Sequence, residues 1–225
     1  MEADEKKETS SGGRHGASHF GDEPGEDLSR ILALSDGVFA FALTLLVLTL
    51  TVPIVNTNGL NPQQSSGALG AALNREYGQF LAYVFAFVMI AIWWRAHHRT
   101  FRYIVRYDSV LTNLNLALLL EIAVMPFILE VYSDYQSTQV AVILFSAIQA
   151  VTGLTLNAIW TYATSNHRLV SPELPEATIH YTTTRGRLTP LIFVAAIGVS
   201  FLNVQAAQYT WILAIVAQRF LVRYG

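Results

Sequence analysis

A single carboxylate stands at the start of the first long apolar run of this chain. Asp36 lies in residues 30–50, RILALSDGVFAFALTLLVLTL, and no further Lys, Arg, Asp or Glu occurs before Arg75. A carboxylate beside hydrocarbon needs compensating hydrogen-bond donors, because burying an unpaired charge is costly. The sequence provides donors at the same boundary, namely Arg30, Ser35, Trp94, His97 and His98.

Trp94 and His98 are four residues apart and therefore share one face of a helix. We expect the indole N–H and a ring N–H of this pair to donate to Asp36. An alternative is that His97 and His98 are interfacial residues beside arginines. A metal site is not favoured here, because no third ligand has suitable spacing.

Helical periodicity places five other residues of the first run on one face. At about 100° per residue this seam contains Gly37, Phe41, Thr44, Leu45 and Leu48, while Asp36 lies about 140° from Phe41. If the seam lines a pore, Asp36 has a structural role and is not an ion ligand. The alternative is ordinary packing, because leucine seams usually form interfaces between helices.

Three polar residues lie inside later apolar runs. Glu121 is near the middle of its run, where an isolated charge costs several kcal/mol. It is either protonated and hydrogen-bonded between helices or a proton-responsive site that modulates flux. Asn115 and Asn157 are more typical of hydrogen bonds between packed helices than of ligands.

The composition predicts an all-α, polytopic membrane protein. Hydrophobic residues make up 52% of the chain, charged residues only 13%, and the mean hydropathy is +0.38, whereas a soluble domain carries about 25% charged residues. The absence of cysteine excludes disulfides and thiolate chemistry. Nucleic acid is not expected as a partner, because the sequence has no clustered basic face.

The hydropathy pattern predicts one membrane domain after a polar tail. Residues 1–27 lack apolar periodicity and are expected to be a disordered cytoplasmic tail. Residues 28–225 are expected to form six transmembrane helices, with a long polar loop after the first; the predicted spans are 28–52, 77–104, 109–132, 138–164, 188–203 and 207–221. This arrangement puts every Lys and Arg except Arg75 on one side of the membrane, which under the positive-inside rule predicts that both termini are cytoplasmic.

These motifs resemble the prokaryotic branch of the transmembrane protein 175 family of potassium channels. The resemblance rests on an arginine followed after five residues by Asp in LSDGVFA, on the TLLVL run that follows, on WWRAHHRTFRYI, and on the Asn-rich third span with Pro126. It covers residues 30–132 with specific motifs and the remaining residues through helix count. Leu34 replaces the usual Phe of the first motif, and Phe41 replaces a branched aliphatic residue.

The resemblance implies a tetrameric cation channel with the first helix lining the pore and no P-loop filter of the TVGYG type. It implies a hydrophobic constriction at Phe41, Leu45 and Leu48, with Thr44 as the polar pore-lining group. It also implies a structural lock that comprises Arg30, Ser35, Asp36, Trp94 and His98. The expected protein is a multi-pass homotetramer in the inner membrane of a prokaryote, with no cofactor. Its expected permeant ion is K⁺, and permeation by other monovalent cations is left open.

Two other functions remain open at this point. A proton-coupled secondary transporter would use Asp36 and Glu121, but transporters usually contain paired broken helices, and only Pro126 breaks a span well inside it. A non-conducting membrane scaffold would use the seam as an oligomer interface. An enzyme is not expected, because the polar residues do not place a nucleophile beside a base.

Overall fold

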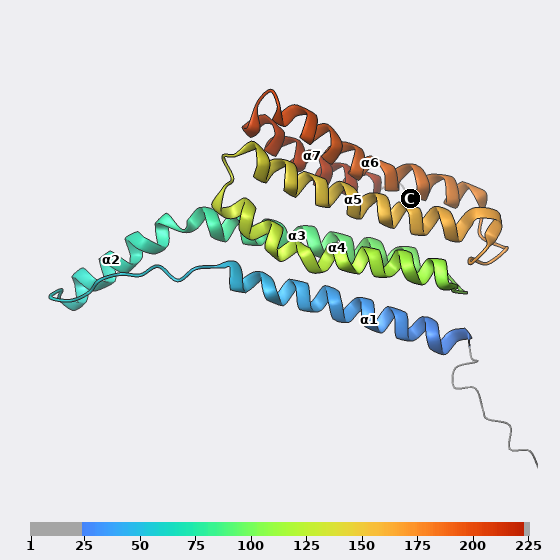
Figure 1. Ribbon diagram of the computed structural model, residues 1–225, viewed down its shortest axis with the longest axis horizontal. Helices are drawn as coiled ribbons and strands as arrows, with labels where there is room; N and C mark the ends of the chain where they lie inside the picture. Colours follow the sequence, from blue (N-terminus) through green and yellow to red (C-terminus); the bar gives the residue numbers. More distant parts are fainter. Residues whose placement is uncertain (1–23, 223–225) are drawn as a thin grey trace, which may run out of the picture.

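The chain folds into an elongated bundle of long helices that run back and forth along one axis (Figure 1). The computed structural model describes residues 24–222, with side chains described for 28–213. The elements are α1 (Pro24–Leu45), a 3-10 turn η1 (Leu46–Thr49), α2 (Pro62–Arg75), α3 (Tyr77–Phe101), α4 (Ser109–Asp134), α5 (Gln139–Thr164), a second 3-10 turn η2 (Ser165–His167), α6 (Glu176–Ser200) and α7 (Val204–Val222).

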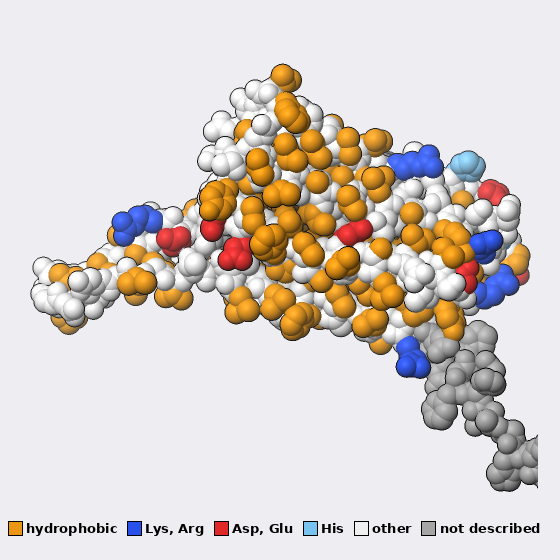
Figure 2. Space-filling model, viewed as in Figure 1, with side chains coloured by type: hydrophobic (Ala, Val, Ile, Leu, Met, Phe, Trp, Pro, Cys, Tyr) orange, Lys and Arg blue, Asp and Glu red, His pale blue; other side chains and the backbone are white. Residues whose placement is uncertain are grey.

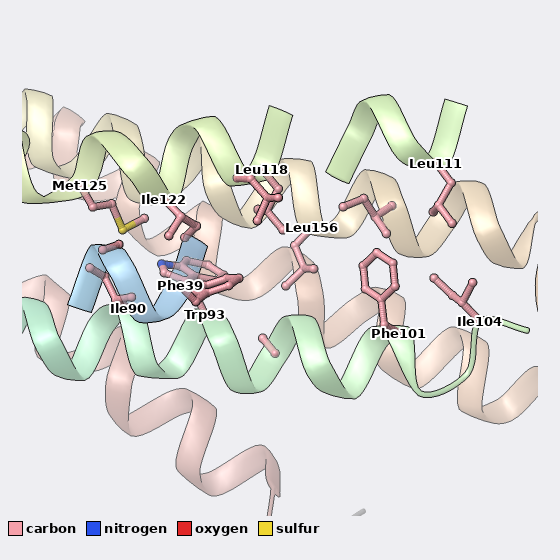
Figure 3. Close-up of a cluster of buried hydrophobic side chains, with 14 of the residues drawn as sticks. Phe39, Ile90, Trp93, Phe101, Ile104, Leu111, Leu118, Ile122, Met125 and Leu156 are labelled. Atoms are coloured by element: carbon pink, nitrogen blue, oxygen red, sulfur yellow. The ribbon is translucent and has the colours of Figure 1, made fainter. Parts of the chain in front are cut away.

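Two clusters of buried side chains hold the bundle together. The first joins α1, α3, α4 and α5 through residues such as Phe39, Trp93 and Ile122 (Figure 3). The second joins α6 and α7 to α3, α4 and α5 around Phe145, Phe193 and Trp211. α1 therefore packs on α3 and α4 at one edge of the bundle, away from α6 and α7.

The face of the bundle seen in Figure 2 carries hydrophobic side chains along most of its length, as expected for contact with lipid. Within the described residues, four segments are long and apolar enough to cross a membrane: Leu28–Thr49, Tyr77–Phe101, Ser109–Asp134 and Gln139–His167. Each exceeds the roughly 20 residues that span a bilayer. The structure thus confirms the prediction of a multi-pass helical membrane protein.

The helices of the structure differ from the predicted spans in several places. α6 begins at Glu176, not at 188, because an acidic first turn follows Pro175 and the polar segment packs against α5. The predicted polar loop contains α2, which starts with a capping box between Asn61 and Gln64. The first helix ends at η1 instead of 52, and its start at Pro24 falls inside the predicted tail; the rest of that tail lies outside the described residues.

The loops at one end of the bundle are tied together by backbone and side-chain hydrogen bonds. Val105 N–H donates to the Leu169 carbonyl at 2.9 Å, and Asp108 caps α4 through Leu111 N–H at 2.8 Å. Tyr162 Oη donates to the same carboxylate at 2.7 Å, and Arg168 donates to Tyr162 Oη at 2.6 Å. Burial acts to raise the pKa of Asp108, but these hydrogen bonds and the Arg168 charge hold it below the usual value.

α5 and α6 approach closely at Gly153. A Cβ added there would lie 2.9 Å from Pro190 Cδ and 3.1 Å from Trp93 Cη2. We expect Gly153→Ala to destabilise the protein by about 1–3 kcal/mol, because both neighbours are rigid and must shift. Gly198→Ala on α6 is the matched control, since nothing lies within 4 Å of its added Cβ. Thermal unfolding followed by tryptophan fluorescence measures both; equal melting temperatures for the two variants would contradict the packing argument.

Candidate functional site

α1 presents two different faces. Its buried face consists of Ser35, Phe39, Ala42 and Leu46, each at most 1% exposed. These positions follow i, i+4, i+7 and i+11 spacing, so they form one stripe that packs against α3 and α4. The bundle therefore fixes the rotation of α1 about its own axis.

The opposite side of the helix is exposed. Gly37, Phe41, Thr44 and Leu48 lie there, and we call them the exposed α1 face; Leu45 is half-buried at its edge. Phe41 is 64% exposed and Leu48 75% exposed. The hydroxyl of Thr44 donates to the Phe41 carbonyl at 2.8 Å, which satisfies it within the helix. In the protomer, two of the three predicted constriction residues, Phe41 and Leu48, thus lie on a surface that no other described element covers.

A chain of buried hydrogen bonds anchors the packed face. His97 Nε2–H donates to Asn115 Oδ1 at 3.0 Å, and Asn115 Nδ2 donates to Ser35 Oγ at 3.0 Å. The Ser35 hydroxyl then donates to the Ile31 carbonyl at 2.8 Å. We call His97, Asn115 and Ser35 the polar anchor. The amide nitrogen of Asn115 faces Ser35, so its oxygen faces His97. This oxygen can only accept, and His97 must therefore carry its proton on Nε2.

Asp36, in the middle of α1, is hydrogen-bonded directly to α3. Trp94 Nε1 donates to Asp36 Oδ1 at 2.8 Å, and the ring of His98 stacks on Trp94 with centroids 5.7 Å apart. Asp36, Trp94 and Arg30 are all exposed in the protomer. The structure therefore brings together Asp36, Trp94 and His98, while Ser35 belongs to the polar anchor.

The sequence predicted that Asn115 bonds between packed helices and named His97 among the possible donors, but it did not show that these two residues pair with each other. Both are 1% exposed, although His97 looked like an interfacial neighbour of arginines. Phe39 and Phe101 pack against its ring, with centroids 5.6 and 4.3 Å away. The two adjacent histidines lie about 100° apart around the helix. The sequence did not show which side of α3 packs against the bundle, so it could not tell that His97 is buried and His98 exposed.

Glu121 lies between α4 and α5. Thr155 Oγ1 donates to its Oε1 at 2.7 Å, whereas Oε2 is buried and has no hydrogen-bond partner among the described residues. An unpartnered carboxyl oxygen in this position is consistent with a proton on the group, because ionisation without a donor is costly there. Asn157 bonds between helices as expected, donating to the Thr183 carbonyl at 3.1 Å.

The part of the chain that the structure describes contains no candidate metal site. No group of three or more His, Cys, Asp and Glu side chains there could hold an ion. The distinctive feature is therefore the exposed α1 face and the hydrogen bonds behind it. Together with the apolar bundle, it defines an integral membrane protein whose first helix turns an apolar face outward.

Comparison with known proteins identifies the family. Residues 30–126 match the family model described as endosomal/lysosomal potassium channel TMEM175. A Streptomyces collinus protein named as a potassium channel is 31% identical over 77% of this chain and 82% of its own length. A second, from Chamaesiphon minutus, is 30% identical over 79% of this chain and 86% of its own length. This chain belongs to the TMEM175 family, as the sequence motifs predicted.

A solved structure supports the same assignment at the level of the fold. The crystal structure of a lysosomal potassium-selective channel TMEM175 homologue from Chamaesiphon minutus matches with a TM-score of 0.73 and 26% identity, covering 87% of this chain and 98% of that chain. A Danio rerio relative is named as an endosomal/lysosomal proton channel; it is 26% identical over 64% of this chain and 26% of its own length. Names within the family therefore include both ions.

Proposed function

We propose that this protein is a potassium-permeable, modestly selective cation channel. The observation that carries the proposal is the exposed α1 face, an apolar surface on a membrane-spanning helix that the protomer leaves uncovered. Four copies arranged with this face inward would enclose a central path along α1. Bacterial relatives named as potassium channels support the choice of ion.

Phe41, Leu45 and Leu48 form the hydrophobic gate in this proposal. They occupy successive turns at the end of α1 and in η1, so each residue type would form one ring in a tetramer. A narrow apolar ring loses its water column unless it widens or neighbouring polar groups wet it. Thr44, between the first two rings, is the nearest polar side chain on the face. Opening then requires a small outward movement of α1.

Selectivity is expected to be modest, because apolar rings supply no cage of carbonyl oxygens to replace the hydration shell of an ion. Phe41 adds a second property. Four aromatic rings facing the path would narrow it and offer their negative faces to a passing cation. The ring at Phe41 is therefore the position most suited to distinguish this channel from relatives with an aliphatic residue there.

The proposed topology has six spans, formed by α1 and by α3 to α7. Lys and Arg side chains gather at the end of the bundle where α1 begins and where α5 joins α6, while Arg75 lies on α2 beyond the opposite end (Figure 2). By the positive-inside rule the basic end faces the cytoplasm. Both termini are then cytoplasmic, and the protein resides in the inner membrane of a prokaryote.

Asp36 is proposed to set the tilt of α1 through its hydrogen bond to Trp94. We expect Asp36→Ala to reduce potassium flux or tetramer yield, because a hydrogen bond to a charged group is worth about 1.5–3 kcal/mol. Trp94→Phe should reproduce the effect, since it removes the donor and retains an aromatic ring beside His98. Glu130→Ala, which removes an exposed carboxylate from α4, is the control. Normal flux and normal tetramers from Asp36→Ala would refute this role.

Regulation of the potassium flux by protons is a second candidate, which the Oε2 atom of Glu121, unpartnered among the described residues, favours. If the Glu121 carboxyl group gains a proton as the pH falls, the potassium flux depends on pH. The protonated form of Glu121 is then dominant at low pH. We expect Glu121→Gln, a permanent mimic of the protonated acid, to flatten that dependence. Flux measured from acidic to neutral pH tests this expectation. An unchanged pH profile would leave Glu121 with a structural role only.

Purified protein in liposomes with a potassium gradient tests the main proposal. A channel gives passive flux that increases with the gradient and needs no coupled ion. Saturable flux that requires a proton gradient would indicate a transporter, and flux no greater than that of empty liposomes would indicate a scaffold. Valinomycin added at the end verifies that a gradient remained to be dissipated.

A further inference from the structure

A segment of the chain projects from the end of the bundle next to η1. It consists of residues 51–75, and we call it the arm; an extended segment leads out of the bundle and α2 leads back to α3. Figure 1 shows the arm beyond the ends of the long helices, leaning toward the side of α1 and away from α6 and α7. The arm therefore lies on the same side of the protomer as α1.

Hydrogen bonds order the arm at both its root and its tip. At the root, the backbone N–H and the hydroxyl of Thr51 both donate to Gln79 Oε1, at 3.0 and 3.1 Å. At the tip, Leu60 N–H donates to the Thr57 carbonyl at 3.1 Å. Gly59 has a φ of +79° in this turn, which glycine adopts without strain. The arm thus has a defined shape and a fixed attachment to the bundle.

The extended segment carries an apolar patch that the protomer leaves uncovered. Val52 is 86% exposed and Ile54 is 102% exposed, whereas Pro53 and Val55 are half-buried. Side chains of an extended segment alternate between its two sides, so Val52 and Ile54 share the side that faces away from the protomer. Two fully exposed branched apolar side chains next to each other are suited to a contact with another molecule.

A second apolar patch lies on α2. Leu69 is 44% exposed and Leu73 is 54% exposed, and their i, i+4 spacing places them on one face of the helix. α2 has 14 residues, with Gly67 and Gly70 in its interior, and a helix of this length and composition is marginal in water without packing. It contacts the bundle where it joins α3, so a further packing partner would stabilise it.

The charges of the arm favour a second copy of this chain as that partner. Residues 51–74 contain no Lys, Arg, Asp or Glu, so identical arms approach one another without repulsion between like charges. Amphipathic helices that lie on a membrane surface are typically rich in Lys and Arg, whereas the one basic residue of α2 is Arg75, at its end. The arm also presents two different patches, as a head-to-tail contact within a ring requires.

The first patch continues the exposed α1 face beyond η1. Leu48 of that face is 75% exposed and precedes Val52 by four residues. We propose that the arm is an intersubunit clamp, in which Val52 and Ile54 of one copy pack against Leu69 and Leu73 of the next copy. This inference rests on the tetramer of the proposed function. Four such contacts would form a collar around the mouth of the path next to η1 and would connect the four gate segments.

Disulfide trapping between copies tests the clamp, because the chain contains no native cysteine. Ile54→Cys and Leu73→Cys are made on separate chains with different tags and co-expressed, so a disulfide between them must join two copies. We expect mild oxidation of the membranes to produce a covalent dimer that carries both tags. Leu202→Cys is the control partner for Ile54→Cys and should form no such dimer; it is 89% exposed in the turn between α6 and α7, at the same end of the bundle.

Removal of the first patch provides a second measurement. We expect V52S/I54S to raise the protein concentration at which the tetramer dissociates in detergent by about ten-fold, because two apolar side chains per contact lose their burial. Mass photometry measures this dissociation, and L202S should dissociate as the wild type does. Circular dichroism verifies that V52S/I54S retains its helices, since both residues lie outside the bundle.

The outcomes separate the clamp from the channel itself. A dimer with both tags and a weaker V52S/I54S tetramer would support the clamp. Potassium flux through tetramers whose arms form no disulfide would overturn the clamp and leave the proposed channel intact, whereas absence of both tetramers and flux would overturn both proposals. Quenching of a fluorophore on Ile54→Cys by brominated lipids, without a disulfide to Leu73→Cys, would assign the arm to the membrane surface and also overturn the clamp.

Discussion

Phe41→Ala is expected to raise potassium flux about ten-fold, which corresponds to a barrier lower by about 1.4 kcal/mol. Phe41 is 64% exposed on α1, and in a tetramer the substitution removes four rings at one level of the proposed path. The wider ring holds water more readily, so the dewetted state becomes less favourable. Flux per tetramer in liposomes, normalised to reconstituted protein, measures the change.

Phe127→Ala provides a matched control for this prediction. Phe127 is 62% exposed but lies on α4, and the proposal places no pore there. Its truncation should leave flux unchanged within the error of reconstitution. The same flux from Phe41→Ala and the wild type, or an equal increase from Phe127→Ala, would show that Phe41 does not limit permeation.

Asn115→Leu is expected to cause the largest loss of stability among the substitutions considered. Asn115 is 1% exposed and bonds to both His97 and Ser35. Leucine leaves a buried imidazole N–H without its acceptor and removes the donor to Ser35. Leaving one such group unsatisfied costs about 1–3 kcal/mol, and in a membrane the cost is reduced where the unfolded state finds other partners.

Thermal unfolding of Asn115→Leu should therefore occur at a clearly lower temperature than that of the wild type. Asn113→Leu is the control, because Asn113 lies on the same helix and is exposed. Flux should also fall in Asn115→Leu, since the polar anchor holds α1 against α3 and α4. A melting temperature equal to that of Asn113→Leu would show that the anchor contributes nothing to stability.

Periodicity and motif content were sufficient to predict the outline of the bundle. The long apolar runs of α1, α3, α4 and α5 are unambiguous because each exceeds the span of a bilayer. The start of α6 could not be predicted, because its first half is polar and rich in Thr, which has low helix propensity. Hydrogen bonds from Asn157 and Trp160 of α5 hold that part of the chain against the bundle.

The candidate site shows the same division between local pattern and tertiary contact. Spacing alone placed Phe41, Thr44 and Leu48 on one face of α1, and the structure leaves that face uncovered. Spacing could not show that Ser35 pairs with Asn115, because these residues belong to helices distant in sequence and meet only when the bundle forms.

The central claim, that the exposed α1 face lines the ion path, is tested most directly by cysteine modification. The chain contains no native cysteine, so Thr44→Cys introduces a unique thiol. Leu191→Cys, at a 62% exposed position on α6, is the control for modification of a surface outside the path. Mass spectrometry verifies that a positively charged methanethiosulfonate reagent labels both variants. We predict that labelling blocks potassium flux through Thr44→Cys and leaves Leu191→Cys unaffected; unchanged flux through fully labelled Thr44→Cys would contradict the account.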